Sequence, residues 1–443
     1  MNAEQLRSIY LRKNLSLAWP LAFNALLMQS MLIIDLLLIS PLGEVSLAAM
    51  GIATTIIAFF LGLQIALANG TQLIVGRIFG AKDKARLQKA FGSGLFISVS
   101  AALIFILLLV LWSDNLTGLL TQDPFIAEQI HNYLSVAQYI LLFNAITQTI
   151  TVYLNGQGNT KTSLQVYLIE VPFNALMSYL LIFGVDNVSM GLGVVGAAYG
   201  SLAAVLLRLI LLFSYVLKQK VLPEVKRKTY LDVTAIKAHF TEIMPIAANF
   251  LVLSVGNTVY QLLFSQLNIY SYVAITLVFP WLRIATQLIV AWAQASAISI
   301  TQAIGQGNIN HIKPIIDSCL KLGAVLACLV ALCLYGFSLS VELIYPKVEQ
   351  QTLIALASIT PLYVLLPLIR TYNTISGNCL RAMGKSMQVL NIHFVTQWVI
   401  VLPLASYFIL VAELPLFWAF ALLPLEELLK SVPFHYMLKN YRI

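Results

Sequence analysis

An acidic side chain interrupts one of the most apolar stretches of the chain. Asp35 follows Met31-Leu32-Ile33-Ile34 and precedes Leu36-Leu37-Leu38. A carboxylate in such surroundings is costly unless it is neutralised, paired or hydrated. Uptake of a proton or another cation relieves that cost. We therefore predict that Asp35 binds a positive ion reversibly; the alternative, a side chain that reaches a nearby aqueous interface, suits the short aspartate poorly.

A polar stripe on another apolar segment supplies partners for such an ion. Glu170, Asn174 and Ser178 recur at intervals of four residues, which places them on one face of a helix. Pro172 in the same stretch removes a backbone donor and frees a carbonyl oxygen for coordination. Glu170 is a second candidate proton site, coupled to Asp35, with a local hydrogen bond as the alternative interpretation.

Further polar residues lie within apolar runs. Pro20 predicts a kink or a hinge on the segment that carries Asp35. Pairing of Arg283 and Arg370 with Glu426 and Glu427 is the simplest account of these charges, and contact with an anionic substrate is the alternative. The candidates for cavity lining are Asn24, Gln29, Tyr139, Asn144, Gln148, Arg283 and Arg370. Ordinary helix–helix hydrogen bonds are the alternative for Tyr139, Asn144 and Gln148.

The composition indicates which elements hold these residues. Of the 443 residues, 60% are hydrophobic and 10% charged, and the mean hydropathy is +0.87. A soluble domain carries about 25% charged residues, so an ordinary globular protein is excluded. Twelve apolar runs are long enough to cross a bilayer as helices. We expect an all-α integral membrane protein with twelve transmembrane helices, which begin near Leu15, Val45, Phe91, Ile130, Ser163, Gly193, Ile243, Tyr272, Ile315, Leu353, Met387 and Leu416.

The basic residues predict the orientation of these helices. All but Lys347, Arg208, Arg283 and Arg370 of the 26 Lys and Arg residues lie in the two tails or in alternate loops. This bias predicts cytoplasmic N- and C-termini. It also accounts for the net charge of +8, so no nucleic-acid partner is expected.

The two halves of the chain resemble each other at a shift of 225 residues. Pro20 then falls on Pro245, Asn24 on Asn249, and Gly80 on Gly305. The pattern predicts two parallel, pseudo-symmetric six-helix lobes around a central cleft. The expected parts are a cytoplasmic N-terminal segment (1–14), an N-lobe (15–217), a cytoplasmic linker (218–241), a C-lobe (242–436) and a cytoplasmic tail (437–443).

Motifs of enzymes and cofactor sites are missing from the sequence. Gly156-Gln157-Gly158-Asn159-Thr160-Lys161-Thr162 resembles a phosphate loop only weakly, because Thr160 replaces a glycine and no strand precedes it. The four cysteines form no CxxC pair and are expected to be small core residues. We expect no enzyme, no metal and no cofactor, with an ion gradient as the energy source.

In order and spacing, these features resemble the MATE (multidrug and toxic compound extrusion) exporters over nearly the whole chain. The resemblance rests on Pro20 to Asp35, Leu47-Ala48-Ala49, Gly156-Gln157-Gly158-Asn159-Thr160, Asn174 to Gly184, and Gly196-Ala197-Ala198-Tyr199-Gly200-Ser201. It implies that Asp35 is the cation-binding carboxylate of the N-lobe. The prokaryotic, DinF-like branch with an N-lobe site adds Asn174, Ser178 and Ser201, where Ser178 replaces an expected acid and Glu170 is the candidate to compensate for it.

The same resemblance bears on the coupling ion. The sodium-coupled branch has a glutamate on the seventh helix and an aspartate on the tenth, which fall on Leu253 and Arg370 here. An arginine repels a cation, so H⁺ is favoured over Na⁺. The implied activity is antiport of amphipathic, often cationic drugs by a monomer in the lipid bilayer of the bacterial inner membrane.

Other functions stay open at this point. A major-facilitator carrier also has twelve spans, although Gly76-Arg77-Ile78-Phe79-Gly80-Ala81-Lys82 lacks the aspartate of that family's loop signature. A flippase for a lipid or lipid-linked precursor is predicted to have more spans and a strongly basic cavity. An intramembrane enzyme needs a nucleophile or metal ligands beside Asp35 and Glu170.

Overall fold

Long apolar segments form long helices because only a helix satisfies its own backbone donors and acceptors in a lipid environment. The computed structural model describes residues 3–185, 189–219, 232–346 and 348–440. The first half contains α1 (Ala3–Ile39), α2 (Glu44–Gly80), α3 (Lys84–Leu120), α4 (Pro124–Gly156), α5 (Thr160–Phe183) and α6 (Val194–Lys218). The second half contains α7 (Val233–Phe264), α8 (Ile269–Gly305), α9 (Ile312–Leu339), α10 (Val341–Ile344), α11 (Gln350–Ala382), α12 (Ser386–Phe394), α13 (Leu402–Ser406) and α14 (Leu416–Lys439).

Side-chain caps start several of these helices. Asp83, Asp123, Asn159 and Asn268 each accept hydrogen bonds from backbone N–H groups in the first turn of α3, α4, α5 and α8. The segment that resembles a phosphate loop only weakly is the turn between α4 and α5, in which Asn159 caps α5 and also donates to the Tyr215 hydroxyl at 2.8 Å. Between α5 and α6, β1 (Gly184–Val185) and β2 (Ser189–Met190) form a short antiparallel pair, a small exception to the predicted all-α fold.

The helix that follows α11 is irregular. Two π-helical segments, Val395–Val401 and Tyr407–Val411, flank α13, and Pro403 lies within this stretch. Proline lacks a backbone N–H, which favours such a local change of hydrogen-bond register. Trp398 Nε1 in the first π segment donates to the Val252 carbonyl at 3.1 Å, which ties this helix to α7.

The chain forms two compact units whose limits differ from the expected lobes. The N-terminal unit is Phe23–Met244, and the C-terminal unit is Met1–Ala22 with Pro245–Ile443. The N-terminal part of α1 thus belongs to the C-terminal unit, and the N-terminal part of α7 belongs to the N-terminal unit. Both helices pass from one unit to the other beside a proline, Pro20 in α1 and Pro245 in α7.

The N-terminal parts of α1 and α7, which we call the exchanged segments, each form an ion pair with the unit that they join. The exchanged segment of α1 supplies the cation of its pair, and that of α7 supplies the anion. In the C-terminal unit, Arg7 Nη2 of α1 lies 3.4 Å from Asp317 Oδ2 of α9. In the N-terminal unit, Lys89 Nζ of α3 lies 3.1 Å from Asp232 Oδ2, next to the start of α7. Arg7 and Asp232 are equivalent in the repeat. The two halves therefore use the same position of the exchanged segment for an ion pair of opposite polarity, although the partners on α3 and α9 differ by three residues in the repeat register.

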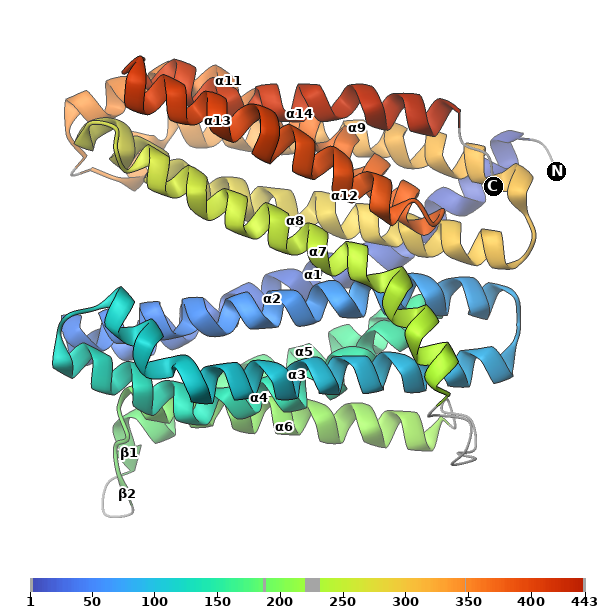
Figure 1. Ribbon diagram of the computed structural model, residues 1–443, viewed down its shortest axis with the longest axis horizontal. Helices are drawn as coiled ribbons and strands as arrows, with labels where there is room; N and C mark the ends of the chain where they lie inside the picture. Colours follow the sequence, from blue (N-terminus) through green and yellow to red (C-terminus); the bar gives the residue numbers. More distant parts are fainter. Residues whose placement is uncertain (1–2, 186–188, 220–231, 347, 441–443) are drawn as a thin grey trace. The chain divides into compact units, whose positions relative to one another are not determined.

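The internal repeat is visible in the helix bounds. α2 and α8 begin and end 225 residues apart, at 44–80 and 269–305. α4 and α11, at 124–156 and 350–382, are offset by 226 residues. The predicted repeat therefore extends beyond its first helix, and the helices of each unit lie side by side (Figure 1).

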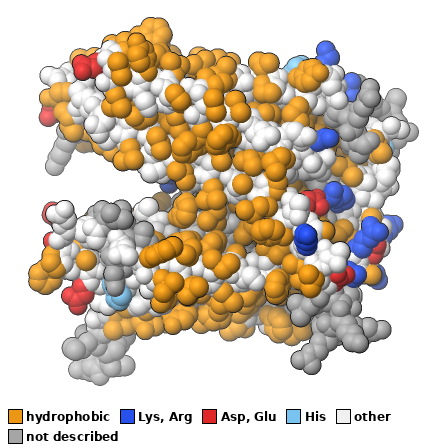
Figure 2. All heavy atoms as spheres, viewed as in Figure 1, with side chains coloured by type: hydrophobic (Ala, Val, Ile, Leu, Met, Phe, Trp, Pro, Cys, Tyr) orange, Lys and Arg blue, Asp and Glu red, His pale blue; other side chains and the backbone are white. Residues whose placement is uncertain are grey.

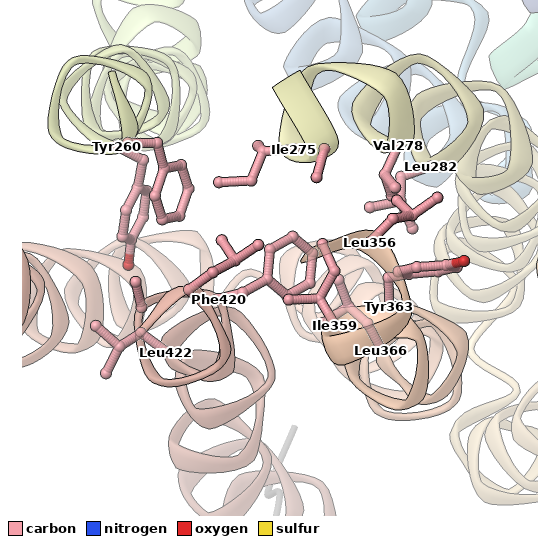
Figure 3. Close-up of a cluster of buried hydrophobic side chains, with 14 of the residues drawn as sticks. Tyr260, Ile275, Val278, Leu282, Leu356, Ile359, Tyr363, Leu366, Phe420 and Leu422 are labelled. Atoms are coloured by element: carbon pink, nitrogen blue, oxygen red, sulfur yellow. The ribbon is translucent and has the colours of Figure 1, made fainter. Parts of the chain in front are cut away.

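Small and bulky apolar residues together fill both cores. In the N-terminal unit, fully buried alanines such as Ala53 of α2, Ala137 of α4 and Ala197 of α6 allow close helix approach. In the C-terminal unit, Tyr260 of α7 and Phe420 of α14 join aliphatic residues of α8 and α11 (Figure 3). These contacts fix the register of the helices that carry polar side chains.

The outer faces of the helices remain apolar. Among the described residues, ten helices are long and apolar enough to cross a membrane; α14 carries Glu426, Glu427 and Lys430 and is not among them. Hydrophobic side chains cover much of the visible face of both units, and Lys and Arg gather toward one end of the helices (Figure 2). The cysteine prediction is half wrong: Cys319 and Cys379 are buried, but Cys328 and Cys333 are exposed.

Candidate functional site

Asp35 lies buried in the N-terminal unit, where two hydroxyl groups hold its carboxylate. The residue is 3% exposed on α1. Ser178 Oγ of α5 donates to Oδ1 at 2.9 Å, and Ser201 Oγ of α6 donates to Oδ2 at 3.0 Å. Three helices thus meet at one carboxylate, and no described Lys or Arg forms an ion pair with it.

Asn174 extends this cluster. Its Nδ2 donates to Ser201 Oγ at 3.2 Å, so Ser201 accepts from Asn174 while it donates to Asp35. The Asn174 Oδ1 atom is buried and has no hydrogen-bond partner among the described residues. We call Asp35, Asn174, Ser178 and Ser201 the carboxylate cluster. The structure brings these four predicted residues together.

A glycine brings α6 against the cluster. A Cβ atom at Gly200 would collide with Ser178 Oγ and would lie 2.7 Å from Ser178 Cα, far inside normal contact distances. Only glycine permits this separation of α5 and α6. The neighbouring Ser201 can therefore reach Asp35, while Tyr133 of α4 approaches Asp35 closely enough to interact electrostatically.

Glu170 lies in an ion pair that the sequence did not predict, while its role as a second proton site stays a prediction. It is fully buried, and Arg208 Nη1 of α6 lies 3.5 Å from its Oε1. The guanidinium also donates to the Tyr167 hydroxyl at 2.9 Å and to Asn144 Oδ1 at 2.8 Å. We call Glu170, Arg208, Tyr167 and Asn144 the arginine cluster.

Hydrogen bonds hold both ends of the Asn144 side-chain amide within the protein, although the sequence suggested that Asn144 lines a cavity. Its Nδ2 donates to Gln64 Oε1 at 2.8 Å, and Gln64 Nε2 donates to the Leu141 carbonyl at 2.9 Å. A hydrogen-bonded chain therefore links α2, α4, α5 and α6. The predicted alternative of ordinary helix–helix hydrogen bonds describes Asn144 in this structure.

The C-terminal unit has its own buried charges. Arg370 Nε of α11 lies 3.2 Å from Glu427 Oε1 of α14, as the predicted pairing required. Glu426 instead pairs with Lys430 and accepts a 2.6 Å hydrogen bond from the Tyr260 hydroxyl. Lys430 was expected among the cytoplasmic basic residues; it is 4% exposed within α14. Glu426 and Glu427, one turn earlier, compensate its charge in this buried position.

Other predicted residues lie apart from both clusters. Arg283 is exposed on α8 and belongs to none of the ion pairs of the described residues, so the predicted pairing fails for it. Asn24 is buried, and Tyr139 is 50% exposed. Gln29 and Gln148 are half-buried. Positions 220–231 of the predicted linker, with Lys347 and Arg442, lie outside the described residues; 233–241 are helical.

Sequence reasoning missed the role of Arg208. Its position within an apolar run was the available signal, because a buried guanidinium requires a carboxylate or several acceptors. Gln64 gave a weaker signal of the same kind. Neither residue could be matched to Glu170 or Asn144 without the relative rotation of α2, α4, α5 and α6.

A family model described as MatE matches residues 20–180 and 245–407. The two matched regions together cover more than half of the chain, and they begin at the equivalent prolines Pro20 and Pro245. This match excludes the major-facilitator interpretation.

Individual relatives align with 65% to 91% of this chain at low identity. An uncharacterized transporter, YisQ, of Bacillus subtilis is 26% identical over 89% of this chain and 86% of that protein. Multidrug and toxin extrusion protein 1 of Xenopus tropicalis is 24% identical over 91% of this chain and 70% of its own. A probable multidrug resistance protein NorM of Rhizobium meliloti is 25% identical over 65% of this chain, which spans 62% of that protein.

Solved structures share the fold. The Vibrio cholerae MATE transporter VcmN in its bent form has a TM-score of 0.85 at 19% identity, covering 98% of both chains. The eukaryotic MATE transporter AtDTX14 has a TM-score of 0.86 at 13% identity, covering 99% of this chain and 97% of its own. With its matched repeats and its helical fold, the chain belongs to the MatE family of multi-pass membrane transporters.

Proposed function

We propose that this protein is a proton-coupled antiporter that exports amphipathic, often cationic drugs, with Asp35 as the coupling carboxylate. The relatives named as multidrug resistance or extrusion proteins support the substrate class. The observation that carries the coupling role is a buried carboxylate that two hydroxyls hold and that no described cationic side chain pairs with. Such a group gains most from binding a cation.

The surroundings of Asp35 favour a proton over sodium. Ser178, Ser201 and Asn174 are neutral, so the carboxylate cluster has one formal negative charge. One proton neutralises it without demanding a shell of several oxygen ligands. In the C-terminal unit, Arg370 stands where the sodium-coupled branch has an acid, and its pairing with Glu427 opposes a cation site there.

The transport cycle requires exchange between two states of opposite access. We assign twelve transmembrane helices to the chain, with both termini cytoplasmic, in a monomer of the bacterial inner membrane. Pro20 lies where α1 leaves one compact unit for the other, so a bend there would couple cation binding at Asp35 to movement of α1. Drug and proton then bind in alternation.

The test uses purified protein in proteoliposomes with an imposed proton gradient. Asp35→Asn should abolish drug antiport and leave the thermal unfolding midpoint close to that of the native protein. Glu44→Gln is the matched control, because Glu44 is an exposed acid at the start of α2. Undiminished antiport by Asp35→Asn contradicts the assignment.

The coupling ion and the substrate class are tested separately. Replacing sodium by choline at a fixed proton gradient should leave native transport unchanged, whereas loss of transport would identify a sodium-coupled exporter. A lipid or lipid-precursor carrier is the competing substrate class. It would move a fluorescent phospholipid between leaflets in an Asp35-dependent manner, and we expect no such movement.

A further inference from the structure

We propose that Arg208 is a positioning residue of the coupling site: it compensates Glu170 as a fixed ion pair, so that the N-terminal unit takes up one cation per cycle, at Asp35. This inference rests on the proposed function of Asp35. It assigns a task to a buried arginine outside the carboxylate cluster, and it removes Glu170 from the cation-binding groups.

The geometry of Arg208 is that of a fixed counter-charge. Arg208 is 4% exposed, and Glu170 is fully buried. Its guanidinium is held by Tyr167 of α5 and Asn144 of α4, and it lies over the Tyr167 ring with 5.2 Å between the guanidinium carbon and the ring centroid. Asn144 is fixed in turn by Gln64 of α2. Three other helices thus orient the positive group beside Glu170.

The charges of the two neighbouring clusters balance only when one cation is added. Asp35 and Glu170 each contribute one negative charge, and Arg208 contributes one positive charge. Glu170 and Asn174 are one helical turn apart on α5, so the arginine cluster adjoins the carboxylate cluster. A single proton at Asp35 makes the whole region neutral, which is the favoured condition inside a membrane.

The ionisable groups that face these carboxylates are few among the described residues. Arg208 of α6 and Tyr167 of α5 face Glu170, and Tyr133 of α4 faces Asp35. The other neighbours named above are neutral hydroxyl and amide groups. Removal of Arg208 would therefore leave two carboxylates with no cationic partner, and Glu170 would itself need a proton.

A lysine cannot replace this arginine. The guanidinium directs separate N–H groups to an amide oxygen on α4 and a hydroxyl on α5 while facing a carboxylate, whereas an ammonium is a compact point charge without this planar fork. Arg208→Lys should keep the overall charge and still weaken the contact with Asn144.

The first experiment counts protonated carboxyl groups by infrared difference spectroscopy of purified protein. The Asp35→Asn protein, which retains Arg208, should show no infrared band from a protonated Glu170 carboxyl group near neutral pH. Arg208→Gln in that background should add one such band, from Glu170, and the further change Glu170→Gln should remove it. Absence of a band in the Arg208→Gln protein overturns the proposal, as does its presence while Arg208 is intact.

The second experiment remains informative if Arg208→Gln does not fold. Glu170→Gln alone leaves the Arg208 charge near Asp35, where it competes with the coupling proton. The pH profile of drug antiport should therefore shift to lower pH by about one unit or more, as neighbouring buried charges commonly produce. Arg208→Gln with Glu170→Gln should restore the native profile. An unshifted profile for Glu170→Gln overturns the proposal.

The outcomes separate this inference from the function on which it rests. If Asp35→Asn abolishes antiport while the Arg208 and Glu170 variants behave as native protein, only the role of Arg208 fails. If Asp35→Asn transports normally, the proposed coupling site fails, whatever the Arg208 variants show.

Discussion

Ser178 and Asp35 are 143 positions apart in the chain, and the Ser178 hydroxyl donates a 2.9 Å hydrogen bond to the Asp35 carboxylate. This bond joins α5 to α1 at the centre of the carboxylate cluster. Together with the bond from Ser201, it stabilises the ionised form of Asp35. Ser178 also stands where the prokaryotic MATE branch is expected to have an acid, so its identity affects the choice of coupling ion.

A second acid at this position should change ion selectivity. Ser178→Asp places two carboxylates together, which favours a metal cation over one proton because both charges then require compensation. We expect antiport by this variant to depend on sodium. The measurement is drug efflux from proteoliposomes with sodium or choline at constant proton gradient. Ser178→Asn, which adds no charge, is the control, and sodium-independent transport by Ser178→Asp would contradict this prediction.

The contact at Gly200 should be sensitive to one methyl group. Gly200→Ala places a Cβ against Ser178 Oγ and 2.7 Å from Ser178 Cα, so α6 must move away from α5. We expect a loss of about 1–3 kcal/mol in the free energy of unfolding, typical of overpacking, together with impaired antiport. Gly51→Ala is the matched control, because a Cβ there meets no atom within 4 Å. Equal free energies of unfolding for the two variants would contradict the close approach of α6 to α5 at Gly200.

The buried charges of the C-terminal unit should depend on each other. Lys430→Gln leaves Glu426 and Glu427 with less compensation, and breaking such a buried pair costs about 3–5 kcal/mol. Combining it with Glu426→Gln should recover part of that loss. Lys439→Gln, at an exposed position on α14, is the control. Thermal or denaturant unfolding in detergent measures all four proteins, and a double variant no more stable than Lys430→Gln would count against coupling.

The ion pair at the start of α7 should be sensitive to acid. The Lys89 ammonium, together with the Ala235 and Thr234 backbone N–H groups, lowers the pKa of Asp232 below its ordinary value. A carboxyl with a lower pKa in the folded state stabilises the fold above the unfolded-state pKa of about 4. That contribution is lost as the pH falls from there through the folded-state pKa.

The measurement compares unfolding midpoints of the native protein and Asp232→Asn. The difference should be largest at neutral pH and should shrink as the pH falls below about 4. Glu349→Gln, which changes an exposed acid before α11, is the control. A difference that stays constant across this pH range would show that the Lys89–Asp232 contact contributes nothing through ionisation.

The sequence by itself determined the long apolar helices, the repeat and the presence of an acid, Asp35, inside an apolar helix. These features depend on local chemistry: apolar runs must form helices in lipid, and a charge within such a run needs a reason wherever the helix packs. Asn174 and Ser178 followed from their helical spacing, and the family resemblance added Ser201.

Apart from the Arg370–Glu427 pair, which the sequence predicted, only the tertiary structure decided which charges are paired. Glu170 meets Arg208, and Glu426 meets Lys430, whereas Asp35 meets two hydroxyls. The sequence also did not predict that the N-terminal parts of α1 and α7 are exchanged between the units. Partner choice depends on the rotation and register of neighbouring helices. Many side-chain contacts set that register together, and hydropathy along a single segment contains no information about it.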